Sequence, residues 1–136
     1  MERIESSLIR IVLDGRGSRL YMPGETLAGS YYVDNIGGDD IQSLECSVLW
    51  YTTGKGSEDF GVHRFWRYDI EKGDWIDPRR PGRFAAVLPN TPLSYPGIIV
   101  KIHWIVRVRV FLSNGLDIVE DLPFRLGKIH DARRLS

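Results

Sequence analysis

Hydrophobic and polar residues alternate with a period of two along most of this chain, most clearly between residues 100 and 112. One set of alternate positions is apolar: Ile102, Trp104, Val106, Val108 and Val110. The positions between them carry basic groups: Lys101, His103, Arg107 and Arg109. A period of two is typical of a β-strand with one buried and one solvated face. The segment therefore predicts a long strand at the surface of a packed core.

Similar runs of Val, Ile, Tyr and Trp recur between short turn signals along the rest of the chain. They predict strands at residues 6–14, 18–22, 25–34, 41–53, 60–71 and 83–88, before a C-terminal hairpin. Apolar spacing of three and four is not sustained, so we expect no helix beyond a short turn within residues 70–77. The pattern predicts an all-β, antiparallel β-sandwich of about eight strands. We expect one domain over residues 1–127 and a flexible basic tail over residues 128–136.

The hairpin allows a prediction of strand register. A tight two-residue turn at Asn114-Gly115 would place Arg109 opposite Glu120 on the outer face. The same count places Arg107 opposite Leu122, which is a poor match of side chains. We therefore expect a bulge, or the end of pairing, near Asp121.

Charge and composition exclude several classes of function. Lys and Arg number 18, Asp and Glu number 18, and 43% of residues are hydrophobic. A formal net charge of zero gives no global attraction to nucleic acid or to an anionic membrane. No segment approaches the roughly 20 apolar residues of a membrane-spanning helix, and the first residues lack a leader pattern. We expect a cytoplasmic protein with no membrane span and no nucleic-acid partner.

Residues capable of chemistry are few. Cys46 is the single cysteine and lies in phase with apolar neighbours, so we expect a buried structural thiol. A metal site would require His63 and His103 to meet beside a carboxylate such as Asp69. Calcium would require paired acids from two loops to converge. Strand-surface histidines and solvated acids are the simpler interpretation, so we expect no catalytic residue, metal or cofactor.

Trp75 is the aromatic residue that does not fit the strand pattern. It lies in the longest irregular connection, KGDWIDPRRPG, close to Arg79, Arg80 and Arg83. An exposed aromatic flanked by arginines is typical of a recognition patch for a protein or a sugar. The alternative is that Trp75 folds back to cap an open end of the sandwich. We take these four residues as the candidate partner-binding site.

Two segments resemble a known family. Tyr21-Met22-Pro23-Gly24-Glu25-Thr26-Leu27-Ala28-Gly29 is similar to the early strand-turn-strand of arrestin-like domains. Leu88-Pro89-Asn90-Thr91-Pro92, followed by the strand at 100–112, resembles the proline-marked loop and long strand of that family. Pro23-Gly24 suits a tight turn, and Gly29 suits a close backbone approach or a bulge. The order and spacing agree to about Gly127.

The resemblance implies an immunoglobulin-like β-sandwich that acts as an adaptor or scaffold without catalysis. A protein partner would bind at a sheet edge or at the end loops, and self-association is a further possibility because the chain has length for one lobe. Ile9-Arg10-Ile11 replaces the adjacent lysines of the family's phosphate sensor, so phosphopeptide binding does not carry over. The alternative function is carbohydrate or small-ligand binding through Trp75 and neighbouring loop residues.

Overall fold

A computed structural model describes residues 8–15, 17–56 and 58–127. Two short 3₁₀ helices, η2 (Gly38–Asp40) and η3 (Ile70–Lys72), lie between the strands of these described residues. The described strands are β1 (Ile9–Leu13), β2 (Leu20–Tyr21), β3 (Thr26–Val33), β4 (Ile41–Gly54), β5 (Phe60–Asp69), β6 (Gly82–Val87), β7 (Tyr95–Pro96), β8 (Val100–Leu112) and β9 (Asp117–Leu126). The expected β-sandwich is confirmed, but it is not wholly antiparallel, because the two-residue strand β2 pairs in parallel with β9. It has nine described strands instead of about eight, the addition being the two-residue strand β7.

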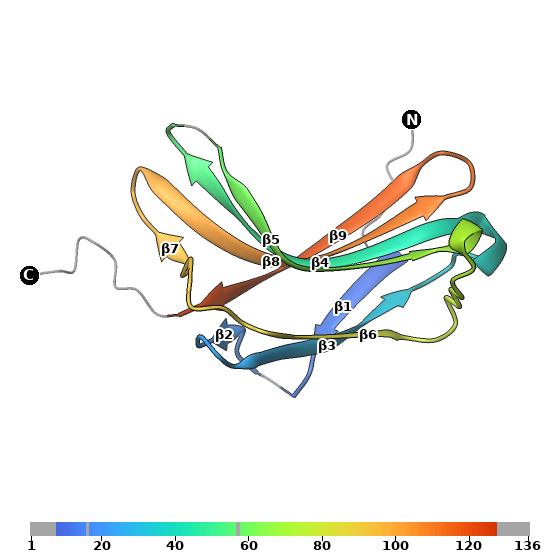
Figure 1. Ribbon diagram of the computed structural model, residues 1–136, viewed down its shortest axis with the longest axis horizontal. Coiled ribbons are helices and arrows are strands. Elements are labelled where there is room, and N and C mark those ends of the chain that lie inside the picture. The colour runs from blue at the N-terminus through green and yellow to red at the C-terminus, as the bar shows by residue number, and fades with distance from the viewer. Residues whose placement is uncertain (1–7, 16, 57, 128–136) are drawn as a thin grey trace, which may run out of the picture.

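The strands form two layers. β1, β3 and β6 make a three-stranded antiparallel sheet, with β3 in the centre. The larger sheet has the order β2-β9-β8-β4-β5, and β7 pairs with β8 outside this path. Figure 1 shows that the larger sheet is strongly bent, with its two ends curving away from the three-stranded sheet. Its outer face is therefore concave.

The core lies between the sheets and is filled by the alternate apolar positions that the sequence pattern marks. Trp104, Val106 and Val108 of β8 are fully buried, and the Trp104 indole Nε1 donates to the Pro92 carbonyl at 2.7 Å. Cys46 is buried among them, as expected, and burial raises the pKa of its thiol to about 12. A thiol that stays protonated and buried is a packing group, not a nucleophile.

Gly29 lies at a point of close packing in the three-stranded sheet. It lies opposite Leu13 on one side and Phe84 on the other. A methyl group added there would lie 2.5 Å from the Val12 carbonyl oxygen and 2.8 Å from the Phe84 ring. The expected close backbone approach at this glycine is confirmed.

The predicted register of the C-terminal hairpin is wrong by one residue. Phe111 pairs with Asp117, Arg107 pairs with Asp121, and the ladder continues without a break to Phe124. The turn has three residues, because the Leu112 amide bonds to the Leu116 carbonyl and Gly115 adopts a φ of 90°. A type I turn followed by a left-handed glycine adds one residue to the loop and shifts every cross-strand pair.

The strand expected at residues 60–71 does not have one continuous apolar face. Val48 of β4 lies opposite Arg64, but the next residue, Leu49, lies opposite Val62, so His63 is the extra residue of a β-bulge. The bulge reverses the side on which residues point. Val62 therefore faces outward and is exposed, whereas Trp66 faces the core.

Candidate functional site

The connection from β5 to β6 presents Trp75 on a closed turn. The Asp69 carboxylate accepts from the Glu71 amide at 2.9 Å, and the Asp74 carboxylate accepts from the Asp69 amide at 2.8 Å. Gly73 ends η3 with a φ of 88°, a left-handed conformation that glycine adopts without strain. These bonds fix the backbone just before Trp75, so the indole is carried on an ordered loop.

Asp77 organises the second half of the connection. Its carboxylate accepts from the Arg79 amide at 3.0 Å and from two Arg79 guanidinium nitrogens at 3.1 and 3.3 Å. The Arg80 amide donates to the Asp77 carbonyl at 3.1 Å, which closes a turn. The Arg79 guanidinium lowers the pKa of Asp77, so this carboxylate is ionised at neutral pH.

A pocket of about 240 Å³ opens beside this connection, at the end of the sandwich where β3, β4, β5 and β6 lie together. We call it the Trp75 pocket. Its walls are mostly apolar or aromatic: Tyr31, Val33, Leu44, Tyr68, Trp75, Ile76, Pro78 and Pro81. Burial raises the pKa of Tyr31, so its phenol stays neutral and can act as a hydrogen-bond donor in the pocket wall.

The four predicted residues do not share one role. Trp75 is 83% exposed, so the alternative that it folds back to cap the sandwich is wrong. Arg80 lines the pocket, and its guanidinium makes no hydrogen bond to the described residues, with Nε 3.8 Å from Asp77. Arg79 is held by Asp77 and stands outside the pocket wall.

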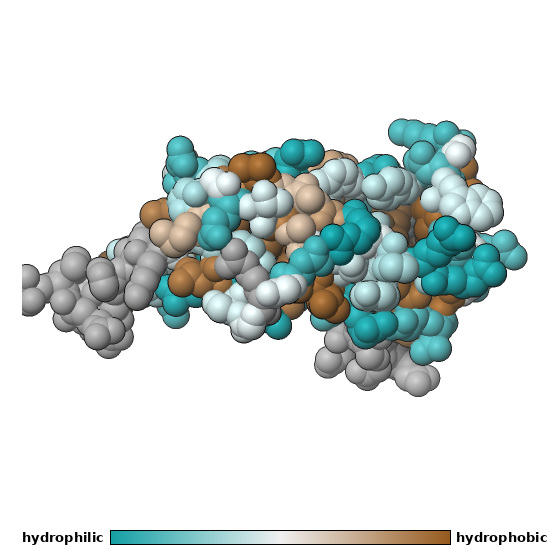
Figure 2. All heavy atoms as spheres, turned by 90° about the horizontal axis from the view of Figure 1, so that it is seen from below, coloured by the Kyte–Doolittle hydropathy of each residue, from teal (hydrophilic) through white to brown (hydrophobic). Residues whose placement is uncertain are grey.

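Arg83 also reaches the pocket, but its guanidinium is already engaged on the outer face of the three-stranded sheet. It donates to the Asp14 carboxylate at 2.8 and 2.5 Å and to the Ser30 hydroxyl at 2.7 Å. The same guanidinium lowers the pKa of Asp14. Figure 2 shows hydrophilic side chains gathered at the end of the molecule where this connection lies in Figure 1. Arg80 is therefore the pocket cation with free donors.

Sequence reasoning missed the aromatic floor of the pocket. Tyr31 and Tyr68 follow the inward phase of their strands, so the pattern marks them as core residues. Tyr31 packs against Gly82, where an added methyl group would lie 2.0 Å from the ring. Gly82, at the start of β6, has no side chain to cover the neighbouring strand. A glycine at that place is the sequence signal that could have indicated an open space beside Tyr31.

The histidines do not form the sites considered from the sequence. His63 Nε2 lies 2.7 Å from the Val87 carbonyl, and His103 Nε2 lies 2.7 Å from the Thr53 hydroxyl. Neither bonded nitrogen is held by a carboxylate. Across residues 8–15, 17–56 and 58–127, no three His, Cys, Asp or Glu side chains are grouped as metal ligands. No helix in that part of the chain has the length and apolarity to cross a membrane.

The two sheets form a β-sandwich, and a comparison with solved structures supports the arrestin-like class of fold. The fold is similar to a solved structure of Spo0M, a sporulation control protein from Bacillus subtilis, with a TM-score of 0.61 and 18% sequence identity. The match covers 89% of this chain and 49% of the Spo0M chain, so this chain spans about half of that protein's length. No protein-family model and no curated protein sequence matches the chain. The similarity between this chain and Spo0M therefore concerns the fold alone.

Proposed function

We propose that this protein is a non-catalytic interaction module that binds a protein partner through the Trp75 pocket. The observation that carries the proposal is an indole 83% exposed on an ordered loop, beside an apolar hollow and a guanidinium with free donors. Exposed aromatic residues and arginines next to a pocket are the groups that dominate binding energy at protein interfaces. The description of Spo0M as a control protein supports a regulatory role over a catalytic one.

The pocket fits one bulky apolar side chain of a partner. Its volume of about 240 Å³ is below the range of about 300–1,000 Å³ that is usual for small-molecule sites, and its apolar walls favour a single aliphatic or aromatic group. The Arg80 donors at the rim favour a carboxylate nearby on the same partner. We therefore expect the partner segment to combine an apolar anchor with an acidic residue.

Selection from a phage-displayed random peptide library tests this function. The intact protein should enrich peptides that hold a bulky apolar residue next to an acidic one. Trp75→Ala should weaken binding of the enriched peptides by about 30-fold or more, since truncating an anchor of this kind costs about 2 kcal/mol. Ile98→Ala, which alters a loop residue that is 72% exposed at the other end of the fold, is the matched control. Equal binding by Trp75→Ala and the intact protein contradicts the proposal.

The exposure of Trp75 also favours a second candidate, carbohydrate binding by stacking of a sugar ring on the indole. A glycan array and the intrinsic fluorescence of Trp75 test it. Glycans that bind and shift the emission of the intact protein, but not of Trp75→Phe, support this function over peptide binding.

Self-association and a cytoplasmic location remain predictions, and sedimentation at high concentration tests self-association.

A further inference from the structure

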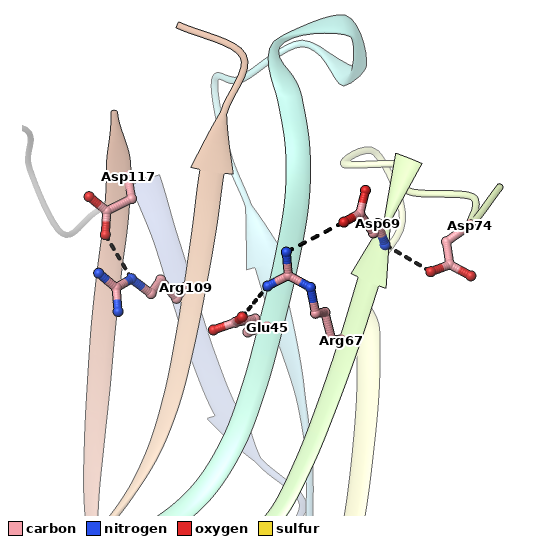
Figure 3. A network of polar contacts seen from close by, with 6 residues as sticks. All are labelled: Glu45, Arg67, Asp69, Asp74, Arg109 and Asp117. Carbon is pink, nitrogen blue, oxygen red and sulfur yellow. Dashed lines mark hydrogen bonds and ion pairs between the residues drawn. The ribbon is translucent and has the colours of Figure 1, made fainter. Parts of the chain in front are cut away.

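The outer face of the larger sheet separates into two halves by charge pairing. In one half each arginine has a carboxylate partner. Arg109 Nε lies 2.7 Å from Asp117, and Arg67 bonds to Glu45 and lies 3.4 Å from Asp69 (Figure 3). The third arginine of this half, Arg107, lies 2.8 Å from Asp121. The positive charge of this half is balanced within the protein.

In the other half, the basic groups have no carboxylate partner among the described residues. Lys101, His103 and Arg125 lie on β8 and β9 just beyond Trp104 and Phe124, the last residues of the ladder between these strands. Neither Lys101 nor Arg125 forms an ion pair with any described residue. We call these three residues the basic corner.

A pocket of about 360 Å³ lies at the basic corner, at the end of the molecule away from the Trp75 pocket. Its lining includes Lys101, His103 and Arg125 and contains no Asp or Glu. Apolar and aromatic groups complete it: Tyr51, Tyr95, Pro96, Ile105 and Pro123. The site therefore combines uncompensated positive charge with apolar surface, which solvated surface lysines alone would not provide.

His103 is held in a fixed orientation within this pocket. Its ring stacks on Tyr51, with centroids 4.9 Å apart, and its Nε2 lies 2.7 Å from the Thr53 hydroxyl. The apolar floor beside it is recessed, because Ile105 is only 2% exposed although it points outward from the sheet. Ile105 lies between Leu49 of β4 and Pro123 of β9 in the ladder.

We propose that the basic corner is a second binding site, which takes an acidic segment of a protein partner. Carboxylates of the segment pair with Lys101 and Arg125, and apolar side chains between them cover Ile105 and Pro123. Three basic groups are too few for the phosphate backbone of a nucleic acid, where six to ten contacts are typical. The apolar lining also favours a peptide over a free inorganic anion, which would leave that lining uncovered.

Fluorescence anisotropy with a labelled peptide of about ten alternating Glu and Leu residues tests the site. The intact protein should bind this peptide more tightly than its Gln and Leu counterpart. Lys101→Gln/Arg125→Gln should weaken binding by about tenfold or more, the usual loss of charge-assisted hydrogen bonds. The matched control is Arg107→Gln/Arg109→Gln, which removes the same charge from the same face and should change affinity by less than about threefold.

Three results would overturn the proposal. Equal weakening by the two double variants would show attraction to the whole face and not to the basic corner. Equal binding of the Glu and Gln peptides would remove the role of the carboxylates. Competition by oligothymidylate or phosphatidylserine vesicles at lower concentrations than the Glu peptide would assign the site to another class of partner. Trp75→Ala should leave this binding unchanged, which separates failure here from failure of the proposed function.

Discussion

The clearest test of the fold is the replacement of Gly29 by alanine. A methyl group at this position would lie 2.5 Å from the Val12 carbonyl oxygen, 2.8 Å from the Phe84 ring and 3.2 Å from the Leu13 Cα. Carbon atoms pack best at about 3.5–4.0 Å, so the contact with Phe84 is too short by about 0.7 Å or more. Two of the three atoms belong to the backbone of β1, and they move only if the strand moves.

Two effects with opposite sign act on this substitution. Replacing glycine in a strand interior by alanine reduces the entropy lost on folding and favours the variant by about 0.5–1 kcal/mol. Overpacking against neighbouring strands costs about 1–3 kcal/mol, and at a backbone contact we expect the upper part of that range. The clash therefore dominates, and Gly29→Ala should lower the free energy of unfolding by about 1–2 kcal/mol.

Urea denaturation followed by tryptophan fluorescence measures the effect, provided that the transition is two-state. Gly17→Ala is the control, because a methyl group at Gly17 would meet no atom within 4 Å. That variant should stay within about 0.5 kcal/mol of the parent. If Gly29→Ala is as stable as the parent or more stable, the close packing of β1 and β6 on Gly29 does not hold.

Three further predictions concern side chains. The thiol of Cys46, with its pKa raised to about 12 by burial, should not react with Ellman's reagent at pH 8 until the protein unfolds; reaction in the folded state would contradict its burial. Because Arg79 lowers the pKa of Asp77, ionised Asp77 should stabilise the fold above its ordinary pKa of 3.8 and lose this effect as pH falls through the lower folded value. An NMR titration should show the lowered value in the parent and a return toward 3.8 in Arg79→Gln. Finally, a double-mutant cycle on Arg107 and Asp121 should give a coupling of about 0.2–1 kcal/mol, and zero coupling would contradict a stabilising ion pair between these two side chains.

The sequence indicated the surroundings of the candidate site but not its shape. Trp75 stood out because it lies among turn residues and arginines, outside any period-two run. Its exposure could not be read from the sequence, since an indole in a loop can equally fold back onto an open end. The roles of the arginines depended on contacts far along the chain: Asp14 engages Arg83 from a position 69 residues away, whereas Arg80 finds no hydrogen-bond partner among the described residues.

Local periodicity determined the strands and the class of fold, because alternation along one segment depends only on which of its residues avoid water. Relations between segments were decided by the tertiary structure. One left-handed glycine, Gly115, lengthened the hairpin loop and moved every pair by one residue, and one inserted residue, His63, reversed the exposed side of β5. A period of two makes such shifts decisive, because a one-residue change exchanges the buried and exposed faces. The basic corner likewise depends on the tertiary structure, because its residues come from β8 and β9, which are separated in the sequence by the hairpin.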